Sequence, residues 1–135
     1  MRVACVSMLL VVIGLVGVAR GEEKITLAAV PPVVVKTVPE AGASGIDSGL
    51  TEIRVTFSKE MTDGSWSWST ASKESFPEMS GKPHYLEDKR TCVMPVRLKP
   101  GMTYAIWVNS QKFHGFQDMD GRPAVPYLLV FETKP

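Results

Sequence analysis

Ten prolines and a series of short alternating segments constrain this chain more than any other feature of its sequence. All ten prolines lie after residue 30, and a proline inside a helix removes a hydrogen bond and clashes with the preceding turn. No window of a dozen residues repeats its apolar side chains with the 3.6-residue period of a helix. Instead, Ile53, Val55 and Phe57 alternate with Arg54 and Thr56, which is the pattern of a half-buried strand. The sequence therefore predicts an all-β protein.

Further segments have this character, and turn residues separate them at intervals of about 8–12 residues. The expected strands are 33–38, 53–57, 66–68, 92–98, 104–108 and 127–133. The segment 92–98 contains Pro95, which favours a sheet edge or a bulge because proline cannot donate to a strand ladder. About six or seven strands in about 100 residues indicate a β-sandwich.

The first 21 residues have the pattern of a secretory signal peptide. Arg2 precedes an apolar run, and Ala19 and Gly21 provide small residues at the −3 and −1 positions of a cleavage site. The alternative is an uncleaved anchor, because about 17 apolar residues are the lower limit for a membrane span. We expect cleavage, followed by a flexible lead-in at 22–30 and a single domain at 31–134.

Removal of this leader leaves a nearly neutral domain without disulfides. The whole chain has 15 basic and 14 acidic residues, and two of the basic residues lie in the leader, so the mature chain has a net charge of −1. Such a balance does not favour nucleic-acid binding. Cys92 is the only cysteine after the leader, which excludes an intramolecular disulfide. We expect its thiol to be buried and inert rather than reactive.

Several segments, in the right order, resemble bacterial Ig-like domains of the S-layer-protein type (SbsA-like Ig domains). They are TVPEAGASGI at 37–46, IRVTFSKEM at 53–61, LKPGMTY at 98–104, FQDMDGRP at 116–123 and FET at 131–133. The resemblance extends roughly from Pro31 to Lys134. It implies an Ig-like β-sandwich of about seven antiparallel strands, used as a structural, adhesive or spacer module on exported proteins.

The segment that resembles this family least, 64–90, contains a candidate aromatic surface. Trp66 and Trp68 alternate with serines, so their indoles would lie on the same face of a strand. If they face water together with Tyr85, they form a platform on which sugar rings stack, which predicts a carbohydrate-binding module. If they face inward they belong to the core, and the alternation favours this interpretation.

A second candidate surface is the polar and aromatic loop 109–116, which follows a predicted strand. Loops at the end of a sandwich are common places for binding residues. Asn109, Phe113 and His114 are its candidate contact residues. The alternative is an ordinary connection between two strands.

Metal binding is the other alternative that the sequence raises. His84, His114 and several methionines suggest a periplasmic copper-carrier-like protein, which is also a small exported β-sandwich. That family has a DGHP segment that supplies a histidine ligand, whereas this chain has Asp120-Gly121-Arg122-Pro123. Asp118 and Asp120 would also begin a calcium loop, but residue 129 is leucine where an EF-hand has glutamate. No metal site and no cofactor are therefore predicted.

We therefore expect an extracytoplasmic, non-enzymatic Ig-like module whose partner is an envelope protein or a glycan. The sequence has no catalytic triad, paired carboxylates or metal motif that would predict an enzyme. A monomer without a membrane span is expected after cleavage of the leader. The specific ligand is not predicted.

Overall fold

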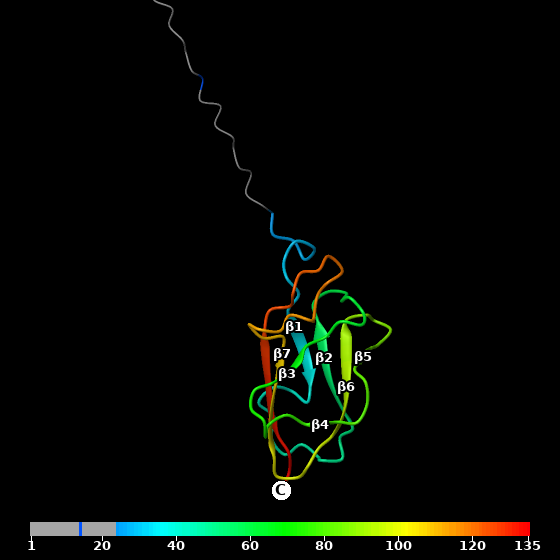
Figure 1. Cartoon of the computed structure of the whole chain (residues 1–135), viewed down its shortest axis with the longest axis vertical. Helices are drawn as coiled ribbons and strands as arrows, with labels where there is room; N and C mark the ends of the chain where they lie inside the picture. The colour runs from blue at the N-terminus through cyan, green and yellow to red at the C-terminus, as the bar shows by residue number, and fades with distance from the viewer. Residues whose placement is uncertain (1–13, 15–23) are drawn as a thin grey trace, which may run out of the picture.

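The computed structural model describes residue 14 and residues 24–135 of the chain. This part contains eight β-strands and no helix, and the strands form two antiparallel sheets (Figure 1). The expected all-β sandwich is confirmed. The predicted leader, apart from Gly14, and the first residues of the predicted lead-in lie outside the described residues. Within the described residues, no helix is long and apolar enough to cross a membrane.

The larger sheet is built around β6 (Thr91–Arg97), its longest strand. On one side β6 pairs with β2 (Glu52–Phe57), which pairs in turn with the edge strand β1 (Val34–Val38). On its other side β6 pairs with two strands of two residues each, β4 (Glu78–Met79) and β5 (His84–Tyr85). These two short strands were not predicted, because two residues are too few to display a period.

The smaller sheet has three strands in the order β3 (Trp68–Thr70), β7 (Thr103–Val108) and β8 (Tyr127–Glu132). β7 is the central strand, and alternate residues of β7 point into the sandwich. The buried side chains on its inner face are Tyr104, Ile106 and Val108. Trp107 lies on the opposite face of the strand, as its place in the alternation predicts.

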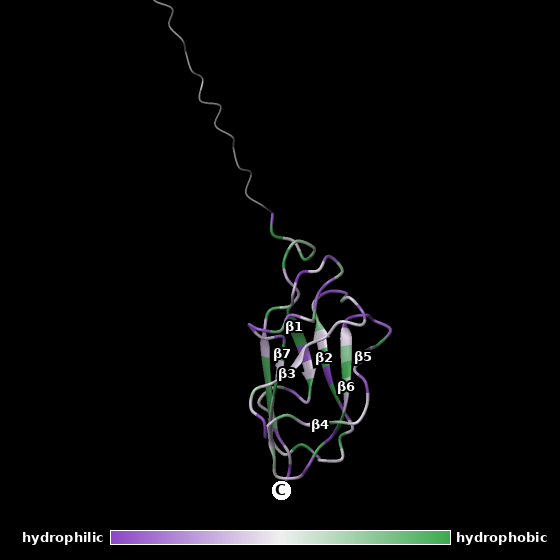
Figure 2. Ribbon diagram, in the orientation of Figure 1, coloured by the Kyte–Doolittle hydropathy of each residue, from purple (hydrophilic) through white to green (hydrophobic). Residues whose placement is uncertain are grey.

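The core lies between the two sheets and consists of two neighbouring clusters of buried side chains. One cluster contains Ile53, Met94, Val96, Tyr104, Ile106, Leu129 and Phe131. The other contains Val55, Phe57, Met61, Cys92, Val108, Phe116 and Ala124. Hydrophobic residues accordingly concentrate on the strands, whereas the connecting loops are more hydrophilic (Figure 2). Because no disulfide is described, burial of this apolar surface is the main stabilising contribution.

The place of Pro95 differs from the sequence prediction of an edge or a bulge. β6 lies between β2 and the β4–β5 pair, so Pro95 is in a central strand. Its carbonyl accepts a hydrogen bond from the Ser80 N–H at 3.0 Å, so its ring nitrogen faces the same side of the strand. On that side the partner strand is interrupted between β4 and β5, and the missing N–H therefore costs no ladder bond.

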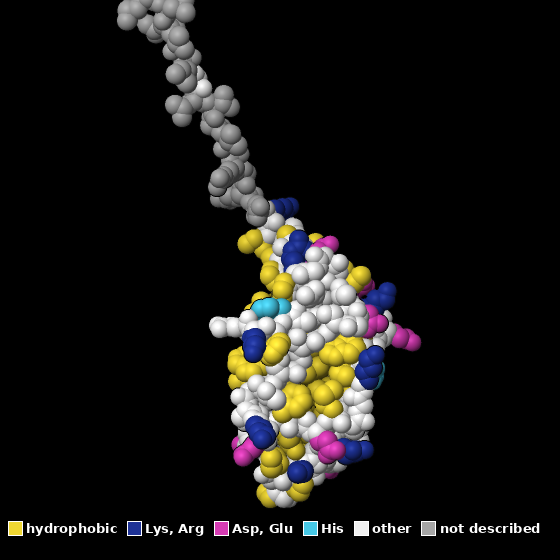
Figure 3. All heavy atoms as spheres, viewed as in Figure 1, with side chains coloured by type: hydrophobic (Ala, Val, Ile, Leu, Met, Phe, Trp, Pro, Cys, Tyr) yellow, Lys and Arg dark blue, Asp and Glu magenta, His cyan; other side chains and the backbone are white. Residues whose placement is uncertain are grey.

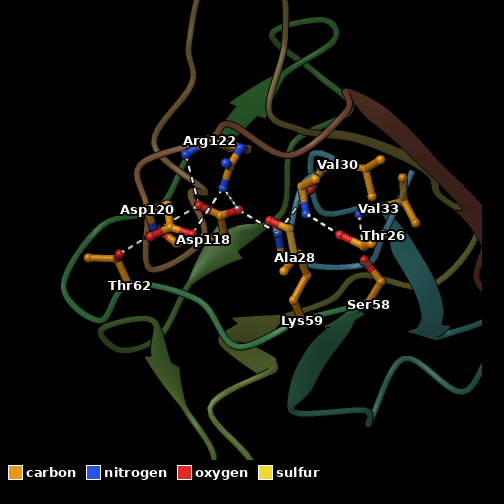
Figure 4. A network of polar contacts seen from close by, with 11 residues as sticks. Thr26, Ala28, Val30, Val33, Ser58, Lys59, Thr62, Asp118, Asp120 and Arg122 are labelled. Atoms are coloured by element: carbon orange, nitrogen blue, oxygen red, sulfur yellow. Dashed lines mark hydrogen bonds and ion pairs between the residues drawn. The ribbon is translucent and has the colours of Figure 1, made fainter. Parts of the chain in front are cut away.

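The segment before β1 is attached to the domain through Lys59. Residues 26–30 form a turn, and the Lys59 ammonium donates to the carbonyls of Ala28 and Val30 at 3.1 and 2.9 Å. The same ammonium pairs with the Asp118 carboxylate at 2.7 Å (Figure 4). The predicted lead-in thus has a defined contact with the sandwich over its last residues.

Candidate functional site

An aromatic groove of about 730 Å³ lies along the open edge of β3. On the inner side of this strand the groove is lined by Trp66, Trp68, Phe76, Met79 and Pro83. On the outer side it is lined by Trp107, Lys112 and Phe113. In the space-filling view, hydrophobic side chains gather in the middle of this face, over the space between β3 and β5 (Figure 3). Grooves lined by aromatic side chains with a few polar groups are the usual form of a ligand site.

The two tryptophans of the sequence prediction form the inner wall of this groove. Both are half-buried, so they are neither a fully exposed platform nor a closed core. Trp68 packs edge-on against Phe116, with ring centroids 5.4 Å apart. Trp66 packs against the second core cluster, and the Lys82 ammonium lies 5.8 Å from the centroid of its ring. The groove is therefore an extension of the hydrophobic core to the surface.

Tyr85 is not among the residues that line the groove. It is the cross-strand partner of Cys92 and packs against the second core cluster, and its hydroxyl is buried. Burial raises the pKa of the Tyr85 hydroxyl above its ordinary value, and the nearby Cys92 and Asp63 raise it further. Tyr85 therefore packs against the core and does not line the groove together with the two tryptophans.

Cys92 is fully buried in the same region, as the sequence predicted. Burial raises the pKa of its thiol to about 12, and the nearby Trp68 indole only partly offsets this effect. The indole nitrogen of Trp68 has no partner with hydrogen-bond geometry among the described residues. The thiol is neutral at physiological pH, and a neutral buried thiol is a poor nucleophile.

The loop 109–116 contributes one of its three predicted contact residues to the groove. Phe113 is half exposed and lines the outer wall. His114 is exposed but is not part of the lining. Asn109 is completely buried, and its amide donates to the carbonyls of Phe116 and Ala124 at 2.9 and 3.0 Å. Asn109 consequently holds the loop in place and is not available to a partner.

Gly115 fastens this loop against the residues before β3. Its N–H donates to the Ser67 hydroxyl at 2.7 Å, and its carbonyl accepts from the Ser65 hydroxyl. A Cβ at this position would lie 2.4 Å from the Trp66 carbonyl oxygen. Only glycine permits this close approach, which places Phe113 beside the edge of β3.

The groove also contains two aromatic residues that sequence reasoning did not assign to a site. Trp107 was expected on the outer face of its strand, and Phe76 belongs to a loop without a recognisable pattern. Both line the groove. The alternation indicated that Trp107 faces outward, but the pairing of β7 with the short strand β3 was needed to place it opposite Ser69, next to the open edge.

The turn around Asp118 has a structural role. Burial alone would raise the pKa of Asp118, but hydrogen bonds from Lys59 and from the backbone N–H groups of Arg122 and Asp120 hold the pKa below its ordinary value. One carboxylate oxygen accepts from the two backbone groups at 2.9 Å, and the other accepts from Lys59 (Figure 4). The oxygens that a calcium ion would require are thus engaged within the protein.

The residues behind the copper alternative lie on separate elements of the structure. His84 lies on β5, and its Nδ1 is 3.2 Å from the Lys82 carbonyl oxygen, whereas His114 lies in the 109–116 loop. Met61 and Met94 are buried in the core. Over residues 14 and 24–135, no three His, Cys, Asp or Glu side chains lie close enough together to hold a metal ion.

The sequence of the sandwich that contains this groove matches a known family of domains. The sequence matches the bacterial Ig-like domain family over residues 28–133. The chain belongs to this family. The resemblance seen in the sequence is thereby confirmed, and the match begins within the turn that Lys59 holds.

One solved structure agrees with this assignment of the fold. A crystal structure of the S-layer protein rSbsC(31-844) is similar with a TM-score of 0.50 and 22% sequence identity over 79% of this chain. The structure of surface layer protein SbsC, domains 1-6, has a TM-score of 0.45 and 22% identity over 80% of this chain. In both cases the chain spans only 14% of the length of the larger protein. No curated protein matches the sequence.

Proposed function

We propose that this Ig-like domain is an extracytoplasmic, non-enzymatic module that binds an envelope component through the aromatic groove at β3. The observation that carries the proposal is the groove itself, in which half-buried aromatic side chains continue from the core to the surface. Aromatic anchors in partly desolvated pockets contribute a large share of the binding energy in protein interfaces. The similarity to an S-layer protein and the leader-like sequence support a place at the cell surface.

The proposal is tested by binding of the protein to isolated envelope fractions. Replacing Trp107 and Phe113 by serine removes the outer wall of the groove and leaves the buried core residues in place. We expect binding to weaken at least about tenfold, because each lost aromatic anchor costs on the order of 1–2 kcal/mol. The matched control replaces Val35 and Val125, which are exposed apolar residues outside the groove. Equal binding by wild type and the Trp107–Phe113 variant would contradict the proposal.

Carbohydrate is the second candidate partner, because tryptophans line the groove. Soluble glycan fragments of the envelope, added as competitors in the same assay, distinguish it from a protein partner. Release of the bound module by glycan alone would identify a carbohydrate-binding module. Release by protease treatment of the envelope would identify a protein partner. Tyr85 does not line the groove, so a stacking platform there would use two of the three expected rings.

A further inference from the structure

The strand next to the groove has unpaired backbone groups at the sheet edge. The Asn109 N–H donates to the Ser67 carbonyl at 3.1 Å, so Ser67 and Ser69 direct their backbone groups toward β7. Backbone groups alternate in direction along a strand. Those of Trp68 and Thr70 therefore point away from the sheet, and they have no hydrogen-bond partner among the described residues.

The other three sheet edges are obstructed. β1 is interrupted by a bulge between Val34 and Lys36 and is followed at once by Pro39. The edge formed by β4 and β5 is broken into two pieces. The edge of β8 is covered by the loop after β1, since the Gly42 N–H donates to the Val130 carbonyl at 2.7 Å. Bulges, prolines, short strands and covering loops are the usual means of preventing strand addition. β3 is short, but it has none of the other protections.

The groove extends over both faces of this open edge. Trp66, Trp68 and Met79 lie on the inner side, and Trp107 and Phe113 lie on the outer side. Alternate side chains of an added strand would point to these two sides in turn. Backbone groups at the centre and side-chain pockets on both sides are the arrangement that proteins use to bind an extended peptide by strand addition.

The charges beside the groove indicate the composition of such a peptide. Lys112 is the only charged residue of the lining, and the Lys82 ammonium lies over the Trp66 ring. No aspartate or glutamate is among the lining residues. A second copy of this chain would present the same two lysines at its own groove, so it does not offer the complementary charge. The groove therefore complements an extended segment that carries acidic residues between apolar ones.

We propose that the groove binds an extended, acidic and apolar polypeptide segment of another protein, which adds as a strand to β3. This inference depends on the proposed function, because it specifies the partner of the same groove. It also goes further, since it assigns part of the affinity to the backbone of Trp68 and Thr70.

The first experiment uses a synthetic eight-residue peptide in which valine alternates with threonine and glutamate. Binding to the protein, expressed as the full chain, is followed by NMR with amide assignments. We expect saturable shifts and slower hydrogen exchange at the amides of Trp68 and Thr70. A peptide with lysine in place of glutamate should bind at least about fivefold more weakly, since the charge complementarity is then reversed. Equal binding of both peptides would overturn the assigned composition.

The second experiment isolates the backbone contribution. Thr70→Pro removes an N–H that is not used within the sheet, and Thr70→Val changes the side chain but keeps that N–H. We expect Thr70→Pro to weaken peptide binding about tenfold, because the peptide carbonyl is left without a partner. Thr70→Val should weaken binding much less than Thr70→Pro, because it keeps the N–H. A peptide N-methylated at alternate residues should lose binding in the same way.

The outcomes separate this inference from the proposed function. If envelope binding needs Trp107 and Phe113 but is unchanged in Thr70→Pro, the groove binds through side chains alone and strand addition is wrong. If wild type dimerises and Thr70→Pro does not, a second copy is the occupant and the acidic peptide is wrong. If the Trp107–Phe113 variant binds the envelope normally, the proposed function itself fails. Loss of folding in Thr70→Pro would show as a changed amide spectrum, and the N-methylated peptide then decides the question.

Discussion

The two lateral sides of the sandwich both expose apolar side chains, but only one of them also has unpaired backbone groups at a strand edge. On the β3 side, Trp66 and Trp68 continue from the core into the groove, beside free backbone groups. On the β1–β8 side, the exposed apolar residues are Val33, Val35, Val38, Val125 and Leu128. There a bulge, a proline and the loop at 42–46 obstruct the strand edges. Exposed apolar area alone therefore does not distinguish a binding edge from a protected one.

The largest effect is expected when the core beneath the groove is removed. Phe116 is fully buried and contacts both Phe57 and Trp68, with ring centroids 5.0 and 5.4 Å away. Phe116→Ala should lower the free energy of unfolding by about 3–5 kcal/mol, because it leaves a cavity. Val35→Ala on the other side should change it by less than about 0.5 kcal/mol. Chemical denaturation of both variants measures the difference, and similar losses would contradict the view that only the groove continues the core.

The next effect concerns the ion pair that fastens the chain before β1. Asp118→Asn leaves the Lys59 ammonium without its buried counter-ion, and we expect a loss of about 2–4 kcal/mol at neutral pH. The pKa of Asp118 is lowered in the folded state, so its contribution is present above the ordinary value of 3.8 and is lost as the pH falls below it. The difference in stability between wild type and variant should therefore shrink below about pH 4. Asp120→Asn, which changes an exposed carboxylate, is the control. If the stability difference between wild type and Asp118→Asn does not depend on pH, this account is wrong.

A smaller effect is expected when the loop that forms the outer wall is displaced. Gly115→Ala places a Cβ against the Trp66 carbonyl and should cost about 1–3 kcal/mol, as overpacking does. It should also weaken envelope binding, because Phe113 moves away from β3. In the control Gly49→Ala, the nearest atom belongs to the movable Asp47 side chain. Thermal unfolding and the envelope assay measure the two consequences, and unchanged binding would show that the position of the loop is unimportant.

The smallest effect is expected at Cys92, beneath the groove. With a pKa of about 12 and no exposed surface, this thiol should not react with a thiol reagent at pH 8 while the protein is folded. It should react fully in denaturant. Fast reaction in the native state would show that solvent reaches β6 through the groove, which would contradict a dry core beneath Trp68.

The sequence alone predicted much of this architecture. Alternation at Ile53, Val55 and Phe57 predicted which side chains of β2 are buried, and the same argument placed Trp107 opposite Tyr104. These predictions were possible because the two-residue period of a strand is a local property of the chain. The resemblance to the Ig-like family was also visible in the sequence, because each of the matching turns and strands is a continuous segment of the chain.

The tertiary structure alone decided which strands lie at an edge. Pro95 suggested an edge, yet β6 is central, because the gap between β4 and β5 accommodates the missing N–H. Trp66 and Trp68 face inward, but they are half-exposed because β3 has a neighbour on only one side. The groove assembles side chains from residues 66 to 113. Strand order depends on pairing between distant segments, and a local period has no information about that order.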